Sequence, residues 1–161
     1  MSKPRNEMKY LNVNRDLLVK QSNISDKDVV LEEKMERLLK DKVHGISFSP
    51  YLDGQDPSEK SQISQVQIAE RLEIIRPHTN WVRTFSCTNG NEEVPRIAHE
   101  KSLKTFVGAW IDTDEENNDL EISNAIRLAK EGYVDMIAVG NEVLLRKEID
   151  VEQLIGYINR V

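Results

Sequence analysis

The stretch that decides the fold is IAVGNEV, residues 137–143, an apolar run that ends in an amide and a carboxylate. An apolar run that follows Asp135 and precedes charged residues is typical of a parallel strand buried on both faces. In α/β folds the carboxyl ends of such strands carry the binding and catalytic side chains. The stretch therefore predicts a parallel sheet and marks Asn141 and Glu142 as candidate functional residues.

Outward from that stretch, a unit of strand, turn and helix recurs through residues 44–161. Four segments are predicted strands: HGISFSPY (44–51), WVRTFSC (81–87), KTFVGAWID (104–112) and residues 135–145. Asn91 is expected to cap the second helix. Helical spacing predicts that the third helix buries Leu120, Ile122, Ala125, Ile126 and Ala129. Strands that alternate with helices predict a parallel sheet with right-handed crossovers.

Two α/β architectures fit four such units. One is an open doubly wound sheet, and the other is a (β/α)8 TIM barrel, which normally needs eight units and about 250 residues. Gly108, Ala109, Ala138 and Gly140 lie inside the third and fourth predicted strands and favour the crowded interior of a barrel. Periodicity alone leaves both architectures open.

The first 43 residues have a different character. Residues 1–23 are polar and unpatterned, which is typical of a loose leader. From Ser25, apolar residues at helical spacing predict a helix that ends near Asp41. We therefore expect a leader with an N-terminal helix over 1–43 and an α/β domain over 44–161.

The composition predicts one ordinary folded domain. The 161 residues are 39% hydrophobic and 31% charged, with a formal net charge of −6. No cluster of basic residues alternates with aromatic ones, so nucleic acid is not an expected partner. The chain has neither a signal-peptide core nor a run near the ~18 apolar residues of a membrane span, so no membrane contact and a cytoplasmic location are expected. The single Cys87 excludes an internal disulfide and is expected to be buried filler.

No cofactor and no metal are expected. The turn after the first strand, residues 49–52, lacks the glycines of a nucleotide-binding loop. His44, His78 and His99 are scattered along the chain and do not predict a zinc site. Residues 112–123 alternate acidic side chains like a calcium loop, but they lack its glycine and its closing glutamate.

Two charged residues remain as candidates. Glu142 follows an apolar run at a strand end, where apolar surroundings favour a general acid; the alternative is that it simply begins the polar loop. Arg83 lies inside a β-rich segment and needs a partner, such as a carboxylate at the mouth of a barrel. The alternative for Arg83 is a charge at the sheet edge whose stem reaches water.

Four successive strand ends resemble one family. The phrases HGISFSPY (44–51), WVRTFSCTNGNE (81–92), VGAWID (107–112) and AVGNEVL (138–144) resemble glycoside hydrolase family 17, the β-1,3-glucanases, and most closely its microbial exo-β-1,3-glucanase-like branch. The resemblance implies a (β/α)8 barrel that cleaves β-1,3-glucan with retention. It implies the acid/base at Glu142, a ligand of the sugar 2-hydroxyl at Asn141, the arginine that positions the nucleophile at Arg83, and walls of the glucose subsites at Tyr51 and Trp110.

The second carboxylate of this chemistry is not found in the sequence. Retaining hydrolysis needs two carboxyls about 5 to 5.5 Å apart. In the family the nucleophile lies at the seventh strand in a phrase of the type Glu-Thr-Gly-Trp, which this chain does not contain. We therefore expect the first four βα units of a barrel, with self-association or a second half-barrel from elsewhere. A non-catalytic glucan-binding half-barrel and a small open-sheet domain of unrelated function are the alternatives.

Overall fold

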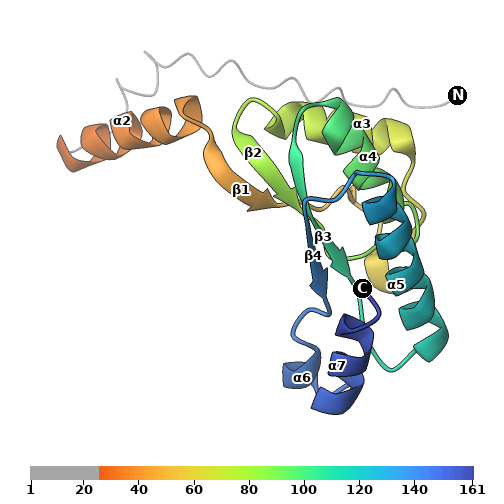
Figure 1. The fold of residues 1–161 in the computed structure, drawn as a ribbon. Helices are drawn as coiled ribbons and strands as arrows, with labels where there is room; N and C mark the ends of the chain where they lie inside the picture. Colours follow the sequence, from red (N-terminus) through yellow and green to blue (C-terminus); the bar gives the residue numbers. More distant parts are fainter. Residues whose placement is uncertain (1–25) are drawn as a thin grey trace, which may run out of the picture. The chain divides into compact units, whose positions relative to one another are not determined.

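The computed structural model describes residues 26–161 (Figure 1), so the predicted leader and the Ser25 cap lie outside the described part. The chain divides into two compact units at Leu38/Leu39. A single described element, the helix α2 (Asp26–Lys40), runs across that division and confirms the predicted N-terminal helix. The boundary we expected at residues 43/44 stays a prediction.

The second unit is built on one parallel sheet. Its strands are β1 (Val43–Ser47), β2 (Thr79–Arg83), β3 (Lys104–Ala109) and β4 (Met136–Val139), in the spatial order β1-β2-β3-β4. The register pairs Gly45 with Trp81, Arg83 with Phe106 and Ala109 with Val139. Helices follow each strand in sequence, so the predicted alternation of strands and helices is confirmed. β1 and β4 form the two edges of an open sheet.

The strands end earlier than the sequence predicted. β2 stops at Arg83 instead of Cys87, which makes Arg83 the last residue of its strand and not a central one. β4 stops at Val139, and the short helix α6 (Val143–Arg146) occupies part of the predicted strand. Residues just beyond the strand ends still contact neighbouring strands: the Phe48 amide donates to the Arg83 carbonyl oxygen, and the Cys87 thiol donates to that of Gly108. Apolar content and periodicity alone do not show at which residue a strand ends.

The helices between the strands begin at caps that the sequence only partly revealed. Ser64 caps α3 (Gln65–Ile75) through the Gln67 amide. Asn91 does not cap α4 (Val94–Glu100); it opens the short 3-10 helix η2 (Asn91–Glu93), and its buried side chain donates to the Thr88 carbonyl oxygen. Gly90 precedes it at φ +93, where a Cβ would lie 2.2 Å from the Ile63 carbonyl oxygen. Only glycine fits so close to the Ile63 backbone in this left-handed conformation.

The third helix, α5 (Glu115–Lys130), starts before the predicted apolar face because Asp114 caps it through the Asn117 amide. Leu120 and Ala129 are exposed, contrary to the prediction, while Leu128 is buried. The last helix, α7 (Val151–Ile158), begins with a capping box between Asp150 and Gln153. Among the described residues no helix is long and apolar enough to cross a membrane.

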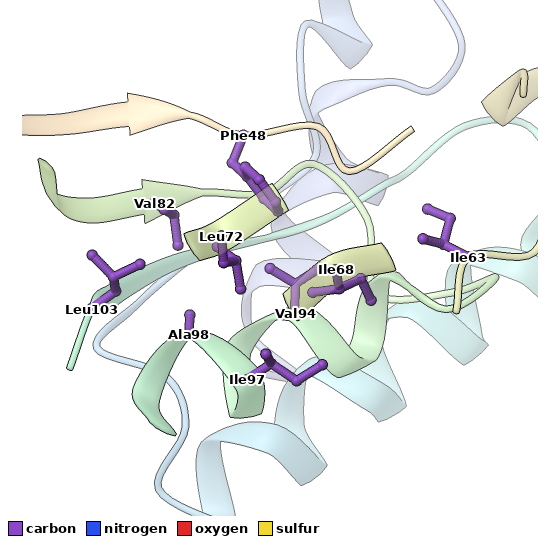
Figure 2. Packing of buried hydrophobic residues seen from close by; sticks show 9 residues of the cluster. All are labelled: Phe48, Ile63, Ile68, Leu72, Val82, Val94, Ile97, Ala98 and Leu103. Atoms are coloured by element: carbon purple, nitrogen blue, oxygen red, sulfur yellow. The ribbon is translucent and has the colours of Figure 1, made fainter. Parts of the chain in front are cut away.

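Two apolar clusters lie between the sheet and the helices. The first joins β2 and the residue after β1 to α3 and α4 (Figure 2): Phe48, Ile63, Ile68, Leu72, Val82, Val94, Ile97, Ala98 and Leu103. The second joins β3 to α5: Cys87, Val107, Ala109, Ile111, Ile122, Ala125, Leu128 and Val143. The partly buried Ile137 and Val139 of β4 pack against it. Along β3 and β4 alternate residues point to the opposite face, where Met136 is 52% exposed. The opposite face therefore lacks the packing that the helix side has.

Candidate functional site

Arg83 and Asn141 meet across the carboxyl ends of β2 and β4. The Arg83 Nη2 atom donates to the Asn141 Oδ1 atom at 2.9 Å. The guanidinium carbon lies 4.7 Å from the centroid of the Phe85 ring and 5.6 Å from that of Phe106. Because arginine only donates, this bond fixes the amide so that the Asn141 Nδ2 atom is a donor. The structure thus brings two of the predicted residues together.

Glu142 lies in the turn that follows β4. Gly140 (φ +77) and Glu142 (φ +55) both adopt left-handed backbone conformations and turn the chain into α6. The Glu142 side chain is exposed, so the apolar surroundings that the sequence predicted are absent. The reason is that the apolar run stops at Val139 and the turn carries Glu142 away from it. A glutamate in this backbone region is uncommon and costs about 1–2 kcal/mol.

A cavity of about 640 Å³ lies beside this pair of strand ends. Tyr51 and Trp110 both line it, which brings together the two predicted aromatic walls. The Tyr51 hydroxyl accepts from the Asn91 Nδ2 atom at 3.0 Å, and the Trp110 Nε1 atom donates to the Asp112 Oδ2 atom at 3.1 Å. Both aromatic side chains are therefore held in place. The further lining residues are Phe48, Ser49, Pro50, Pro57, Ser58, Lys60, Phe85, Ser86, Thr88, Asn89, Asn91, Asp112, Asn117, Glu121 and Glu148.

The cavity and the Arg83–Asn141 pair are neighbours but not one site. Arg83, Asn141 and Glu142 do not line the cavity. Phe85 connects them, since it lines the cavity and lies under the Arg83 guanidinium. The aromatic rings and the amides of this region are the mixture of apolar surface and few fixed polar groups that small-molecule sites share.

Glu121 is the site residue that sequence reasoning missed. It lies on α5, is only 1% exposed and lines the cavity. Its Oε1 atom accepts from the hydroxyls of Ser86 at 2.5 Å and Thr88 at 2.8 Å. Its Oε2 atom accepts from the amides of Cys87 at 2.5 Å and Trp110 at 3.2 Å. Burial raises the pKa of Glu121 above its ordinary value, although the four hydrogen bonds lower it.

Glu121 belongs to a row of polar side chains on α5. Asn118, also buried, accepts from the Asp112 amide at 2.9 Å and donates to the Asp112 carbonyl oxygen at 2.8 Å. Asn124 donates to the Cys87 carbonyl oxygen at 2.8 Å. The spacing of three residues places all of them on one side of the helix. Through these contacts one side of α5 holds the loops that follow β2 and β3.

The other reactive side chains have structural surroundings. Cys87 is buried, its Sγ atom donates to the Gly108 carbonyl oxygen at 3.3 Å, and burial raises its pKa. The Nε2 atom of His99 lies 3.1 Å from the Asp135 Oδ2 atom at the opposite ends of the strands. Within residues 26–161 no group of three metal-binding side chains lies close enough to hold an ion.

Comparison with known proteins identifies the family of this chain. The model of the BtgE/BtgC glycoside hydrolase domain matches residues 45–161. The Aspergillus niger protein btgC, which carries the name of a glucan endo-1,3-beta-glucosidase, is 30% identical over 110 residues, covering 61% of this chain and 16% of that protein.

Solved structures agree on the fold. The crystal structure of a glycoside hydrolase family 17 beta-1,3-glucanosyltransferase from Rhizomucor miehei matches with a TM-score of 0.61 and 24% identity, over 75% of this chain and 44% of that one. An active-site mutant of that enzyme in complex with laminaritriose matches with a TM-score of 0.60 and 24% identity, over 74% and 44% of the two chains.

The fold is therefore that of the first part of a TIM-barrel glycoside hydrolase, which resolves the choice between the two architectures. This chain belongs to the BtgE/BtgC glycoside hydrolase domain family, and the resemblance to glycoside hydrolase family 17 is confirmed. It spans 16% of the length of btgC and 44% of the Rhizomucor enzyme.

Proposed function

We propose that this chain carries the acid/base half of a retaining β-1,3-glucan hydrolase site. The observation that supports it is the Arg83–Asn141 hydrogen bond of 2.9 Å, which holds the residue next to Glu142 at the carboxyl edge of the sheet. In this proposal Glu142 protonates the leaving glycosidic oxygen and later takes a proton from the attacking water. Its exposed position leaves it accessible to a polymer.

The other predicted residues have supporting roles in the proposal. With its oxygen held by Arg83, the Asn141 amide is left to donate from Nδ2, which suits a sugar 2-hydroxyl. In the proposal the N–H groups of Arg83 that Asn141 does not occupy position the second carboxylate of the retaining mechanism. Tyr51 and Trp110 offer the apolar ring faces on which glucose units stack. The complex of the Rhizomucor enzyme with laminaritriose supports a β-1,3-linked oligosaccharide as the ligand class.

A non-catalytic glucan-binding half-barrel is the second candidate, and one observation favours it. The cavity with Tyr51 and Trp110 is a formed site, whereas Glu142 is exposed and lies outside it. Binding in such a cavity needs no second carboxylate. In this case Glu142 would be an ordinary surface residue of the α6 turn.

Incubation of the purified chain with laminarin oligomers separates these candidates. Turnover that falls by about 10² or more in Glu142→Gln supports the acid/base role. Without turnover, saturable laminaritriose binding that weakens in Asn141→Ala supports the proposed half-site, which has only one of the two carboxyls that turnover needs. Binding that Asn141→Ala leaves unchanged favours the binding module. Turnover that is unchanged in Glu142→Gln overturns the assignment of Glu142. If a cooperatively folded chain shows neither binding nor turnover, both candidates are overturned.

A further inference from the structure

One guanidinium connects the two halves of the candidate site. Arg146, at the end of α6, donates through Nη1 to the carbonyl oxygen of Asn141 and through Nη2 to that of Ile111 at 3.1 Å. The first carbonyl follows β4 and the second follows β3. Arg146 also pairs with Glu148 at 2.5 Å between Nη2 and Oε2. A single side chain therefore fixes the backbone at two strand ends.

The same guanidinium covers one face of an aromatic wall. Its central carbon lies 4.3 Å from the centroid of the Trp110 ring, within the range of a cation–π contact. The indole N–H is occupied by Asp112, and the Trp110 amide is occupied by Glu121. Trp110 is thus held at its backbone, at its ring nitrogen and on one ring face. The other face is left for the cavity that Trp110 lines.

We infer that Arg146 is a positioning residue that sets the sugar-stacking face of Trp110 and the Asn141–Glu142 turn together. This inference rests on the proposed glucan site. The planar guanidinium can donate to two carbonyls and cover a ring at once, because its donors lie in one fixed fork. A lysine keeps the charge and the pair with Glu148 but cannot do both. Arg146 therefore contributes geometry that its charge alone does not supply.

The consequence for ligand selection concerns the number of sugar units that Trp110 holds. Because Arg146 occupies one ring face, Trp110 stacks on a single glucose unit and cannot be sandwiched between two. The acidic residues Asp112, Glu121 and Glu148 line the same cavity with one basic residue, Lys60, so a neutral glucan fits it better than an anionic sugar polymer does.

The test replaces Arg146 and follows Trp110. The chain has two tryptophans, so Trp81→Phe leaves Trp110 as the only fluorescent indole. In this background we compare Arg146→Lys, Arg146→Gln and the matched control Arg127→Lys, which alters an exposed ion pair with Glu131. The measurements are acrylamide quenching of Trp110 without ligand, laminaritriose affinity, and thermal unfolding.

Both Arg146 variants are expected to make Trp110 about twofold more accessible to quencher and to weaken laminaritriose binding by about tenfold, the equivalent of one lost charged hydrogen bond. Arg127→Lys is expected to change neither. Unaltered quenching in both folded Arg146 variants overturns the inference whatever the binding result. If Trp81→Phe itself binds no laminaritriose, the proposed function fails, while the quenching comparison still decides the role of Arg146. If neither Arg146 variant unfolds cooperatively, the residue is structural and the inference is overturned.

Discussion

Glu121 and Glu142 are two carboxylates at the same edge of one sheet, and their surroundings are opposite. Glu121 is buried and accepts four hydrogen bonds from the loops after β2 and β3. Glu142 is exposed, in a left-handed turn. A buried carboxylate whose oxygens all accept hydrogen bonds fixes a structure, whereas an accessible acid in an unfavourable backbone conformation is typical of a functional position. The comparison separates the residue that builds the site from the residue that we propose acts in it.

We expect the largest loss in the free energy of unfolding from removal of the Glu121 carboxylate. Glu121→Ala leaves two backbone amides and two hydroxyls without an acceptor, so we expect a loss of about 3 kcal/mol or more in the free energy of unfolding. Glu121→Gln is expected to cost less than half as much, because its oxygen can accept from both amides while the hydroxyls accept from its NH2 group. Urea denaturation measures both changes.

A matched control is Glu131→Ala on the same helix, which removes an exposed ion pair with Arg127 and should cost at most about 0.5 kcal/mol. An equally small loss in Glu121→Ala would show that the buried carboxylate does not hold the loops.

The pH dependence of stability tests the effect of burial on Glu121. Burial raises the pKa of Glu121, so the folded state binds its proton more tightly than the unfolded state does. Its favourable contribution is complete below the ordinary value near 4.5 and is lost as pH rises through the folded-state pKa. We therefore expect the stability of the wild-type chain to fall relative to Glu121→Gln over that window. A relative gain with rising pH would contradict the raised pKa.

The smallest expected effect is a gain in the free energy of unfolding, and it concerns Glu142. Glu142→Gly removes a Cβ from a residue at φ +55, and we expect a gain of about 0.5–1 kcal/mol in the free energy of unfolding. Lys147→Gly, at φ +59 on the other end of α6, is the matched control and should gain as much. A gain at Lys147 with a loss at Glu142 would mean that the Glu142 side chain has a structural role.

The sequence predicted the framework of this molecule better than its details. Local patterns predict the order of strands and helices, and the phrase around Asn141 indicates the family. The ends of the strands depend on contacts with residues far away in the sequence: Ser86 and Cys87 look like part of a strand but donate to Glu121 on α5. For the same reason Glu142 was expected among apolar residues and is exposed.

The sequence did not predict the role of Glu121, because a single acidic residue between Leu120 and Ile122 is typical of the polar edge of an amphipathic helix. Its donors come from loops 11 to 35 positions away in the sequence, and no local pattern records them. The alternation of acids at 112–118 is explained by the start of α5, where Asp114 is the cap and Asn118 holds the Asp112 backbone.

The central claim is that a β-1,3-glucan binds at the carboxyl edge of this sheet, beside the Asn141–Glu142 turn. The most direct measurement is a laminaritriose titration of the ¹⁵N-labelled chain, with cellotriose as the linkage control. The Trp110 indole N–H and the Asn141 side-chain amide should shift saturably with laminaritriose, while the Trp81 indole on the sheet should not. No saturable shift at Trp110 and Asn141, or equal shifts with cellotriose, would contradict the claim.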